Sequence, residues 1–225
     1  MSKIGMASAA AALAAMMGAA PALAEDGVRG KLAGDFVVGL GAIGVLPENG
    51  NHSSVDTING HVRASNSATA QVDFTYFINP NISLNLIVAS TQHDLSVKGS
   101  ALGNVQLGSI WVLPPTLTLQ YHPLPQSRFS PYVGAGLNYS IFYGSSLSGA
   151  NPAVRSVAVN NGFGFALNAG IDYEISGPWG INLDVKKLFL SPNAAVGTNL
   201  GVKVHASTEL NPLVVGMSVR YRFSL

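Results

Sequence analysis

The stretch QVDFTYFI, residues 71–78, decides the fold. Its even-numbered residues are all apolar, whereas Gln71, Asp73 and Thr75 between them are polar. Successive side chains of a β-strand point to opposite faces of its sheet. The alternation therefore predicts a strand with one apolar face and one polar face.

Alternating stretches of this kind recur along the chain. They predict eight strands, at residues 34–46, 68–79, 82–93, 115–123, 131–144, 162–175, 179–190 and 211–223. We expect short turns at 79–81, 123–129 and 176–178, and long polar loops at 47–67, 94–114, 145–161 and 191–210. This pattern predicts an all-β fold, an eight-stranded antiparallel transmembrane β-barrel with short periplasmic turns and long extracellular loops.

The composition agrees with a wall that faces lipid. Charged residues make up 10% of the 225 residues, whereas soluble domains carry roughly 25%. A soluble eight-stranded carrier barrel, with its apolar face inward, would expose too few charges for solubility. The 12 basic and 11 acidic residues leave no basic excess for phosphates, which excludes nucleic acid as a partner. Without cysteine, the chain has no disulfide and no thiolate metal site.

The first 24 residues have the pattern of an export signal. Lys3 precedes a run rich in Ala, Met and Leu, which ends in Pro21-Ala22-Leu23-Ala24. A basic start, an apolar run and an A-x-A site are typical of a secretory signal peptide. We expect a cleaved signal over residues 1–24 and an outer-membrane barrel over residues 25–225. An anchoring helix is the alternative, but the run is short for a membrane span of about 20 residues.

The polar faces of the predicted strands would line a narrow lumen. With the N-terminus on the periplasmic side, charged inward residues gather at the periplasmic end, where an unpaired buried charge would be costly. We expect a paired ionic plug of Asp172, Asp184, Lys186, Arg220 and Arg222. Toward the outer end the inward residues become apolar, and we expect the channel lining to include Ile43, Val45, Ile87, Phe142 and Leu188.

Two proline sites bear on how a solute would leave such a closed lumen. Pro114-Pro115 and Asn211-Pro212 stand where descending strands begin, and proline cannot donate to a β-ladder. Missing ladder bonds there would let the upper wall open laterally into the bilayer. Simple strand termination is the alternative interpretation of these prolines.

Two motifs resemble cofactor or metal sites. Residues 39–44 spell G-x-G-x-x-G, but they lie within a predicted strand that runs into a turn. A dinucleotide site needs this motif between a strand and a helix. The histidines show no i, i+3 or i+4 spacing of a compact ligand pair, and those in or beside the long loops are best interpreted as solvated. These histidines are His52, His61, His93 and His205. We expect no cofactor and no metal.

An outer-membrane acyltransferase is the enzymatic alternative. It would need a His, an acid and a Ser to converge, such as His93, Asp94 and Ser96. Neighbouring residues of a strand point to opposite faces, so these three side chains are poorly aimed at one another. We therefore expect that the protein is not an enzyme.

Two segments also carry a resemblance to a known family. LPPTLTLQY, residues 113–121, and PYVGAGLNY, residues 131–139, resemble signature segments of the OmpW family, which has AlkL-like relatives. Residues 34–47 resemble its first strand, and residues 184–187 and 211–223 its last two. The chain departs from the family pattern where Ser224 and Leu225 follow the aromatic Phe223. The resemblance implies an outer-membrane barrel with a narrow apolar channel for small hydrophobic compounds.

The sequence thus predicts a protein of the cell outer membrane that binds and passively conducts small hydrophobic solutes. Its other expected partners are the outer-membrane lipid and the outer-membrane assembly machinery. A structural or receptor barrel without transport is the main alternative, and an acyltransferase is less favoured.

Overall fold

A computed structural model describes residues 28–48, 54–55, 61–100, 103–147, 154–190, 193–198, 203–207 and 211–224. The predicted signal peptide lies outside these residues. Within the described residues, no helix is long and apolar enough to cross a membrane. The strands are β1 (Phe36–Leu46), β2 (Ser54–Val55), β3 (His61–Ala64), β4 (Ser67–Asn79), β5 (Ile82–Ala89), β6 (Thr91–Ser100), β7 (Gly103–Leu113), β8 (Thr116–Tyr121), β9 (Phe129–Leu147), β10 (Val154–Val159), β11 (Gly162–Ser176), β12 (Trp179–Phe189), β13 (Asn193–Thr198), β14 (Lys203–Ser207) and β15 (Leu213–Phe223).

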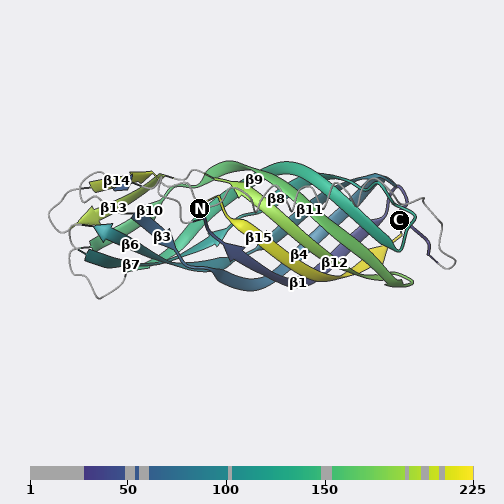
Figure 1. Ribbon diagram of the computed structural model, residues 1–225, viewed down its shortest axis with the longest axis horizontal. Coiled ribbons are helices and arrows are strands. Elements are labelled where there is room, and N and C mark those ends of the chain that lie inside the picture. The colour runs from purple at the N-terminus through teal and green to yellow at the C-terminus, as the bar shows by residue number, and fades with distance from the viewer. Residues whose placement is uncertain are drawn as a thin grey trace.

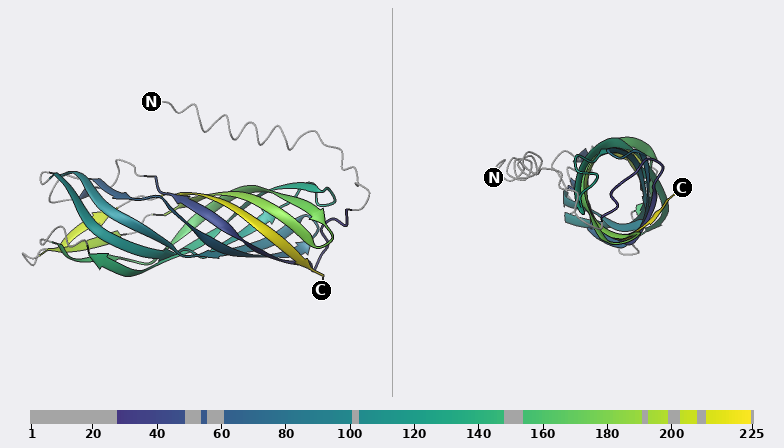
Figure 2. Two further views of the ribbon diagram at one scale, coloured as in Figure 1. Left: turned by 90° about the horizontal axis from the view of Figure 1, so that it is seen from below. Right: turned by 90° about the vertical axis from the view of Figure 1, so that its right-hand side faces the viewer.

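Eight antiparallel strands form a closed barrel. Their order is β11-β12-β15-β1-β4-β5-β8-β9, and β9 pairs with β11 to close the ring. The end-on view of Figure 2 shows the ring, and Figure 1 shows its strands crossing the barrel obliquely. Closure leaves no sheet edge with unpaired backbone groups, which a lipid environment would penalise. The predicted eight-stranded antiparallel barrel is confirmed.

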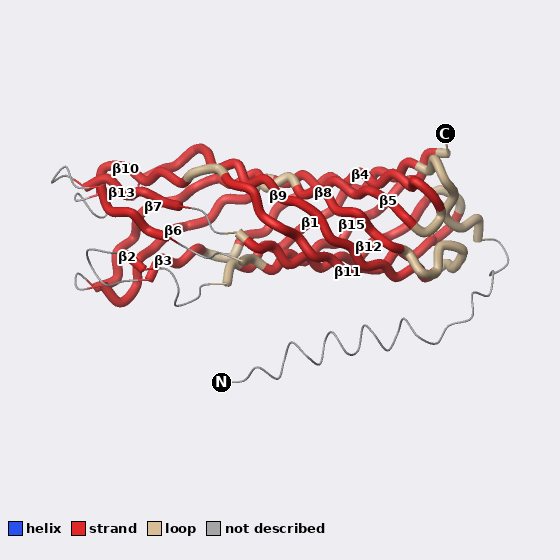
Figure 3. Tube along the Cα trace, turned by 90° about the horizontal axis from the view of Figure 1, so that it is seen from above, coloured by secondary structure: helices blue, strands red, loops and turns tan. Residues whose placement is uncertain are grey.

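The long connections differ from the polar loops that the sequence predicted, because they contain strands. β6 and β7 extend the barrel beyond β5 and β8 and form a sheet in the order β9-β7-β6-β3. A separate sheet has the order β10-β13-β14-β2. Figure 3 shows the strands in red, with short tan breaks where the barrel passes into this extension. These segments were predicted as loops because their outer face is polar, as at Asp94 and Lys98, although the alternating residues Leu95 and Val97 are buried.

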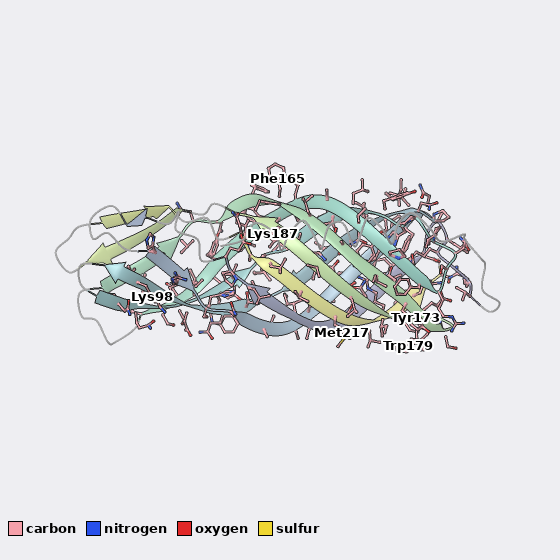
Figure 4. All side chains as sticks on the ribbon, viewed as in Figure 1. Lys98, Phe165, Tyr173, Trp179, Lys187 and Met217 are labelled. Atoms are coloured by element: carbon pink, nitrogen blue, oxygen red, sulfur yellow. The ribbon has the colours of Figure 1, made fainter. Side chains whose placement is uncertain are left out.

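The barrel wall presents its large apolar side chains outward. Leu40 is 64% exposed, Phe165 68% and Met217 61%. Figure 4 shows Phe165 and Met217 on the outside of the ribbon, with Tyr173 and Trp179 near its short-turn end. At that end Trp179 stacks edge-on against Tyr221, with ring centroids 4.9 Å apart. Amphipathic rings of this kind form the girdles that mark membrane interfaces.

We predict that Met217→Arg lowers the free energy of unfolding by about 2–4 kcal/mol, the cost of a basic side chain at the bilayer midplane. Met217→Leu, which keeps the face apolar, should stay within about 1.5 kcal/mol of wild type. Urea unfolding in lipid vesicles measures both values. Equal losses in the two variants would show that Met217 does not face lipid.

Candidate functional site

An apolar cavity of about 100 Å³ lies inside the barrel, where it passes into the extension. All five residues predicted as channel lining border it: Ile43, Val45, Ile87, Phe142 and Leu188. They come from four different strands, and four of them belong to one buried apolar cluster with Ala89, Ala166, Leu190 and Val214. A cavity needs roughly 10–15 Å³ to hold one water molecule, so this cavity has room for several groups of that size.

A few polar side chains also border this cavity. His93, expected to be a solvated loop residue, is instead buried and lines it. Its Nδ1 donates to the Ser65 carbonyl oxygen at 2.7 Å, and its Nε2 accepts from Thr91 Oγ1 at 2.9 Å. Burial lowers the pKa of His93, which keeps the ring neutral. Asp94 is exposed on the other face of the strand, so the two side chains do not form a catalytic pair.

The floor of the cavity is formed by the Lys186 side chain, which pairs with Asp184. The other carboxylate oxygen of Asp184 accepts hydrogen bonds from Tyr132 Oη at 2.7 Å and Asn168 Nδ2 at 3.0 Å. Asn182 Nδ2 in turn lies 2.9 Å from Tyr132 Oη. The Lys186–Asp184 pair is therefore held in a hydrogen-bonded layer below the cavity.

A second charged layer lies nearer the short-turn end. Arg220 binds Asp172 at 2.7 Å and Asp73 at 2.8 Å, and Asn182 Nδ2 donates to Asp172 at 2.9 Å. Asn182 thus connects this layer to the one above it. Lys31 Nζ approaches Asp172 to 3.4 Å.

Arg222 belongs to a third layer, at the mouth of the barrel. It pairs with Glu174 at 2.7 Å and lies 3.9 Å from Asp35. The five predicted plug residues are therefore spread over three layers. The sequence prediction did not include Lys31 or Asp73. Asp73 could have been found from its inward position, whereas nothing in the sequence pattern shows that the segment before β1 folds back.

The segment before β1 closes the short-turn end. Lys31 N donates to the Pro125 carbonyl oxygen and Gly34 N to that of Phe77, each at 2.8 Å. The Lys31 side chain is buried. The end-on view of Figure 2 shows this purple segment crossing the ring. The lower lumen is therefore occupied by paired charges around a small cavity of about 40 Å³, and it is capped by the chain itself.

His122, in the connection after β8, is fully buried against this charged layer. Its Nε2 lies 3.0 Å from Ser83 Oγ and its Nδ1 3.8 Å from Asp172. Burial lowers the pKa of His122 to about 3, because its effect outweighs that of the Asp172 charge, which alone would raise the pKa. The ring is therefore neutral at physiological pH.

The barrel wall has a gap in its hydrogen-bond ladder beside the cavity. The β5–β8 pairing ends at Ile87 and Thr116, and the β6–β7 pairing begins at Thr91 and Val112. Among the described residues, no ladder pair joins residues 88–90 to residues 113–115. A hydrogen bond between Ser90 Oγ and Tyr143 Oη crosses the wall at this level. The gap lies at Pro114-Pro115, one of the two proline sites where missing ladder bonds were predicted.

The second predicted opening, at Asn211-Pro212, is instead held by hydrogen bonds. Leu188 N donates to the Pro212 carbonyl oxygen and Leu190 N to Asn211 Oδ1, each at 3.0 Å. The adjoining strand supplies the donors, so the missing proline N–H does not open this seam.

No group of three or more His, Cys, Asp or Glu in the described part of the chain could hold a metal ion.

Gly39 provides the space that Asp73 needs to reach Arg220. A Cβ atom on Gly39 would stand 2.1 Å from Asp73 Oδ2, whereas one on Gly44, in the same strand, would meet nothing within 4 Å. We predict that Gly39→Ala lowers the free energy of unfolding by about 1–3 kcal/mol through overpacking, while Gly44→Ala changes it by less than about 0.5 kcal/mol. Urea titration of both variants tests this. Equal effects would mean that the Asp73 contact does not constrain Gly39.

His122 should make the barrel sensitive to acid. Its pKa is lower in the folded state than the ordinary value of 6.5, so below pH 6.5 the unfolded chain binds a proton that the folded chain does not. Stability is therefore lost as the pH falls, by about 1 kcal/mol per pH unit for one proton. His122→Asn should lose less stability than wild type between pH 6.5 and 4, measured by Trp fluorescence during urea unfolding. Parallel pH profiles would contradict the assignment.

Comparisons with known proteins agree with this architecture. Residues 32–223 match the OmpW family. An outer-membrane protein of Sinorhizobium fredii is 35% identical over 201 residues, covering 89% of this chain and 84% of the relative. Outer membrane protein W of Vibrio cholerae is 32% identical over 197 residues, covering 84% of this chain and 89% of the relative.

The crystal structure of the outer membrane protein OprG from Pseudomonas aeruginosa superimposes with a TM-score of 0.81 at 25% sequence identity, covering 88% of this chain and all of OprG. With that fold and these relatives, the short-turn end is periplasmic and the extension is extracellular. The protein is thus a non-enzymatic β-barrel of the Gram-negative cell outer membrane, and it belongs to the OmpW family.

Proposed function

We propose that the protein binds small hydrophobic molecules in its apolar cavity and conducts them passively into the outer membrane. The observation that carries this proposal is the division of the lumen. The extracellular half contains an apolar cavity, whereas the periplasmic half contains paired charges and only a small cavity among them. A purely structural barrel has no use for a cavity of this kind at its extracellular end.

The division gives a direction to the transport path. Each methylene group that leaves water for the cavity gains about 0.8 kcal/mol, so an apolar solute is drawn in from the extracellular side. Farther down, the solute would have to separate Arg220 from Asp172 and Asp73. Breaking a buried ion pair by removing one partner costs about 3–5 kcal/mol. The lower lumen therefore blocks apolar solutes.

Lateral exit into the bilayer follows from this block. The ladder gap at Pro114-Pro115 lies in the cavity wall, because Ala89, Thr91, Val112 and Pro114 all border the cavity. No ladder pair joins residues 88–90 to residues 113–115, so no ladder bond has to break to part these two segments. The Pro114 and Pro115 carbonyl oxygens accept hydrogen bonds from Asn138 in β9, the strand on the side of residues 113–115 away from the gap. Ser90 and Tyr143 hold the gap from outside by a hydrogen bond, whose net contribution is only about 0.5–1.5 kcal/mol.

We predict that Leu188→Asp strongly reduces uptake of an apolar tracer, because it places a desolvated charge on the path. Leu188→Met, which keeps the cavity apolar, should retain uptake. Both variants are reconstituted into liposomes and compared with empty liposomes, using one apolar and one polar tracer. If wild-type protein takes up neither tracer faster than empty membranes, the structural alternative holds and conduction is wrong.

A double variant separates lateral exit from passage through the periplasmic end. Arg220→Gln with Arg222→Gln loosens the charged layers and should admit small polar ions without raising apolar uptake. Loss of apolar transport in this variant, with transport intact in Leu188→Asp, would show that the solute passes straight through the lower lumen.

A further inference from the structure

We propose that the cavity selects solutes that combine an apolar chain with one uncharged oxygen acceptor, such as the carbonyl of a ketone or the hydroxyl of an alcohol. The Lys186 ammonium at the cavity floor would donate the hydrogen bond that recognises this oxygen. The inference rests on the proposed function, since it names the class of molecule that the same cavity binds.

Lys186 is placed by β12 where a polar head group would arrive. It lies between Asp184 below and Leu188 above on the inward face of the strand, and its Cα partners are Asn168 and Val214. Leu188 and Val214 border the cavity together with Lys186. The Lys186 side chain is only 4% exposed. A solute whose chain packs against these apolar groups would therefore meet the ammonium at its inner end.

The Lys186 ammonium has more N–H donors than acceptors. It carries three N–H groups, and among the described residues the structure gives it one acceptor, Asp184 Oδ1. Asp184 itself is occupied, because its Oδ2 accepts from Tyr132 and Asn168. Within the described part of the chain, Asp184 does not border the cavity. The Lys186 side chain therefore borders the cavity, whereas its counter-ion does not. A turn of the Lys186 side chain about its flexible stem would bring the ammonium to a solute oxygen.

The other polar groups around the cavity are already engaged. Thr116 Oγ1 donates to the Pro114 carbonyl oxygen at 3.0 Å, and Ser140 Oγ donates to Asn138 Oδ1 at 2.8 Å. The ring nitrogens of His93 bond Ser65 and Thr91. Lys186 is thus the donor that remains for a solute among these described groups.

The charge balance favours an uncharged oxygen over a carboxylate. Lys186 and Asp184 together are neutral, so a bound carboxylate would leave one net negative charge in an apolar cavity, which is costly. A bound ammonium would face the Lys186 cation directly. A carbonyl or hydroxyl oxygen accepts the free N–H without adding charge, and a hydrogen bond from a charged donor is stronger than one between neutral groups.

The experiment compares decane with decan-2-one labelled with ¹³C at its carbonyl. The full-length barrel is reconstituted in lipid nanodiscs, and its affinity for each compound is measured. The infrared carbonyl band of the bound ketone is recorded separately. We expect tighter binding of the ketone by about tenfold and a carbonyl band shifted to lower frequency. Lys186→Met should lose both effects and bind decane as before.

Two further variants control this comparison. Lys187→Met makes the same change one residue away on the opposite face and should keep the ketone preference and the shifted band. Lys186→Met combined with Asp184→Asn removes the unpaired carboxylate that the single variant leaves buried. It should also lose the ketone preference, which covers the case in which the single variant fails to fold.

The outcomes distinguish this inference from the function on which it rests. Equal binding of decane and decan-2-one, unchanged in both Lys186 variants, would overturn the role of Lys186 and leave the apolar conduit standing. Failure of wild-type protein to bind either compound would overturn the conduit itself. Decanoate that binds more tightly than the ketone, and loses this advantage in Lys186→Met, would show that the head group is a carboxylate and that the uncharged oxygen is wrong.

Discussion

The closed backbone ladder is the constraint on which the rest of the structure depends. In lipid an unpaired backbone N–H or C=O costs several kcal/mol, so the strands must pair all the way around the ring. A ladder of eight strands encloses a lumen so narrow that side chains fill it. Every second residue then faces either lipid or this confined space. The inward residues must therefore pair with one another or pack as apolar groups.

Both solutions occur, at different heights. Arg220 lies between Asp73 and Asp172 at the periplasmic end, where Gly39 leaves space for the Asp73 side chain. Toward the extracellular end the inward residues are apolar and leave a cavity. The ladder is interrupted beside this cavity, at Pro114-Pro115, where the wall passes into the extension. Binding of apolar solutes and a route into the bilayer thus follow from the same narrow geometry.

The alternation of residues was enough to predict the ring and the side on which each residue lies. Ile43 and Leu188 are far apart in the chain, yet parity and strand direction placed both at the cavity. The extension strands were missed because their outer face meets water, and polar residues such as Asp94 and Lys98 gave these segments the composition of loops. Lys31 was missed because it lies in the segment before β1, whose folding back no periodicity encodes. His93 was misread as a solvated loop residue, although it shares the buried face of its strand with Leu95 and Val97.

The position of a bound apolar solute tests most directly whether the lumen is divided. Crystals of the protein soaked with 1-bromooctane, measured at the bromine absorption edge, locate the halogen by its anomalous signal. We predict bromine density within the cavity bordered by Ile43, Ile87 and Leu188. Bromine density beside Asp172 and Arg220 would show that apolar solutes enter the charged half, which would contradict a lumen closed at its periplasmic end.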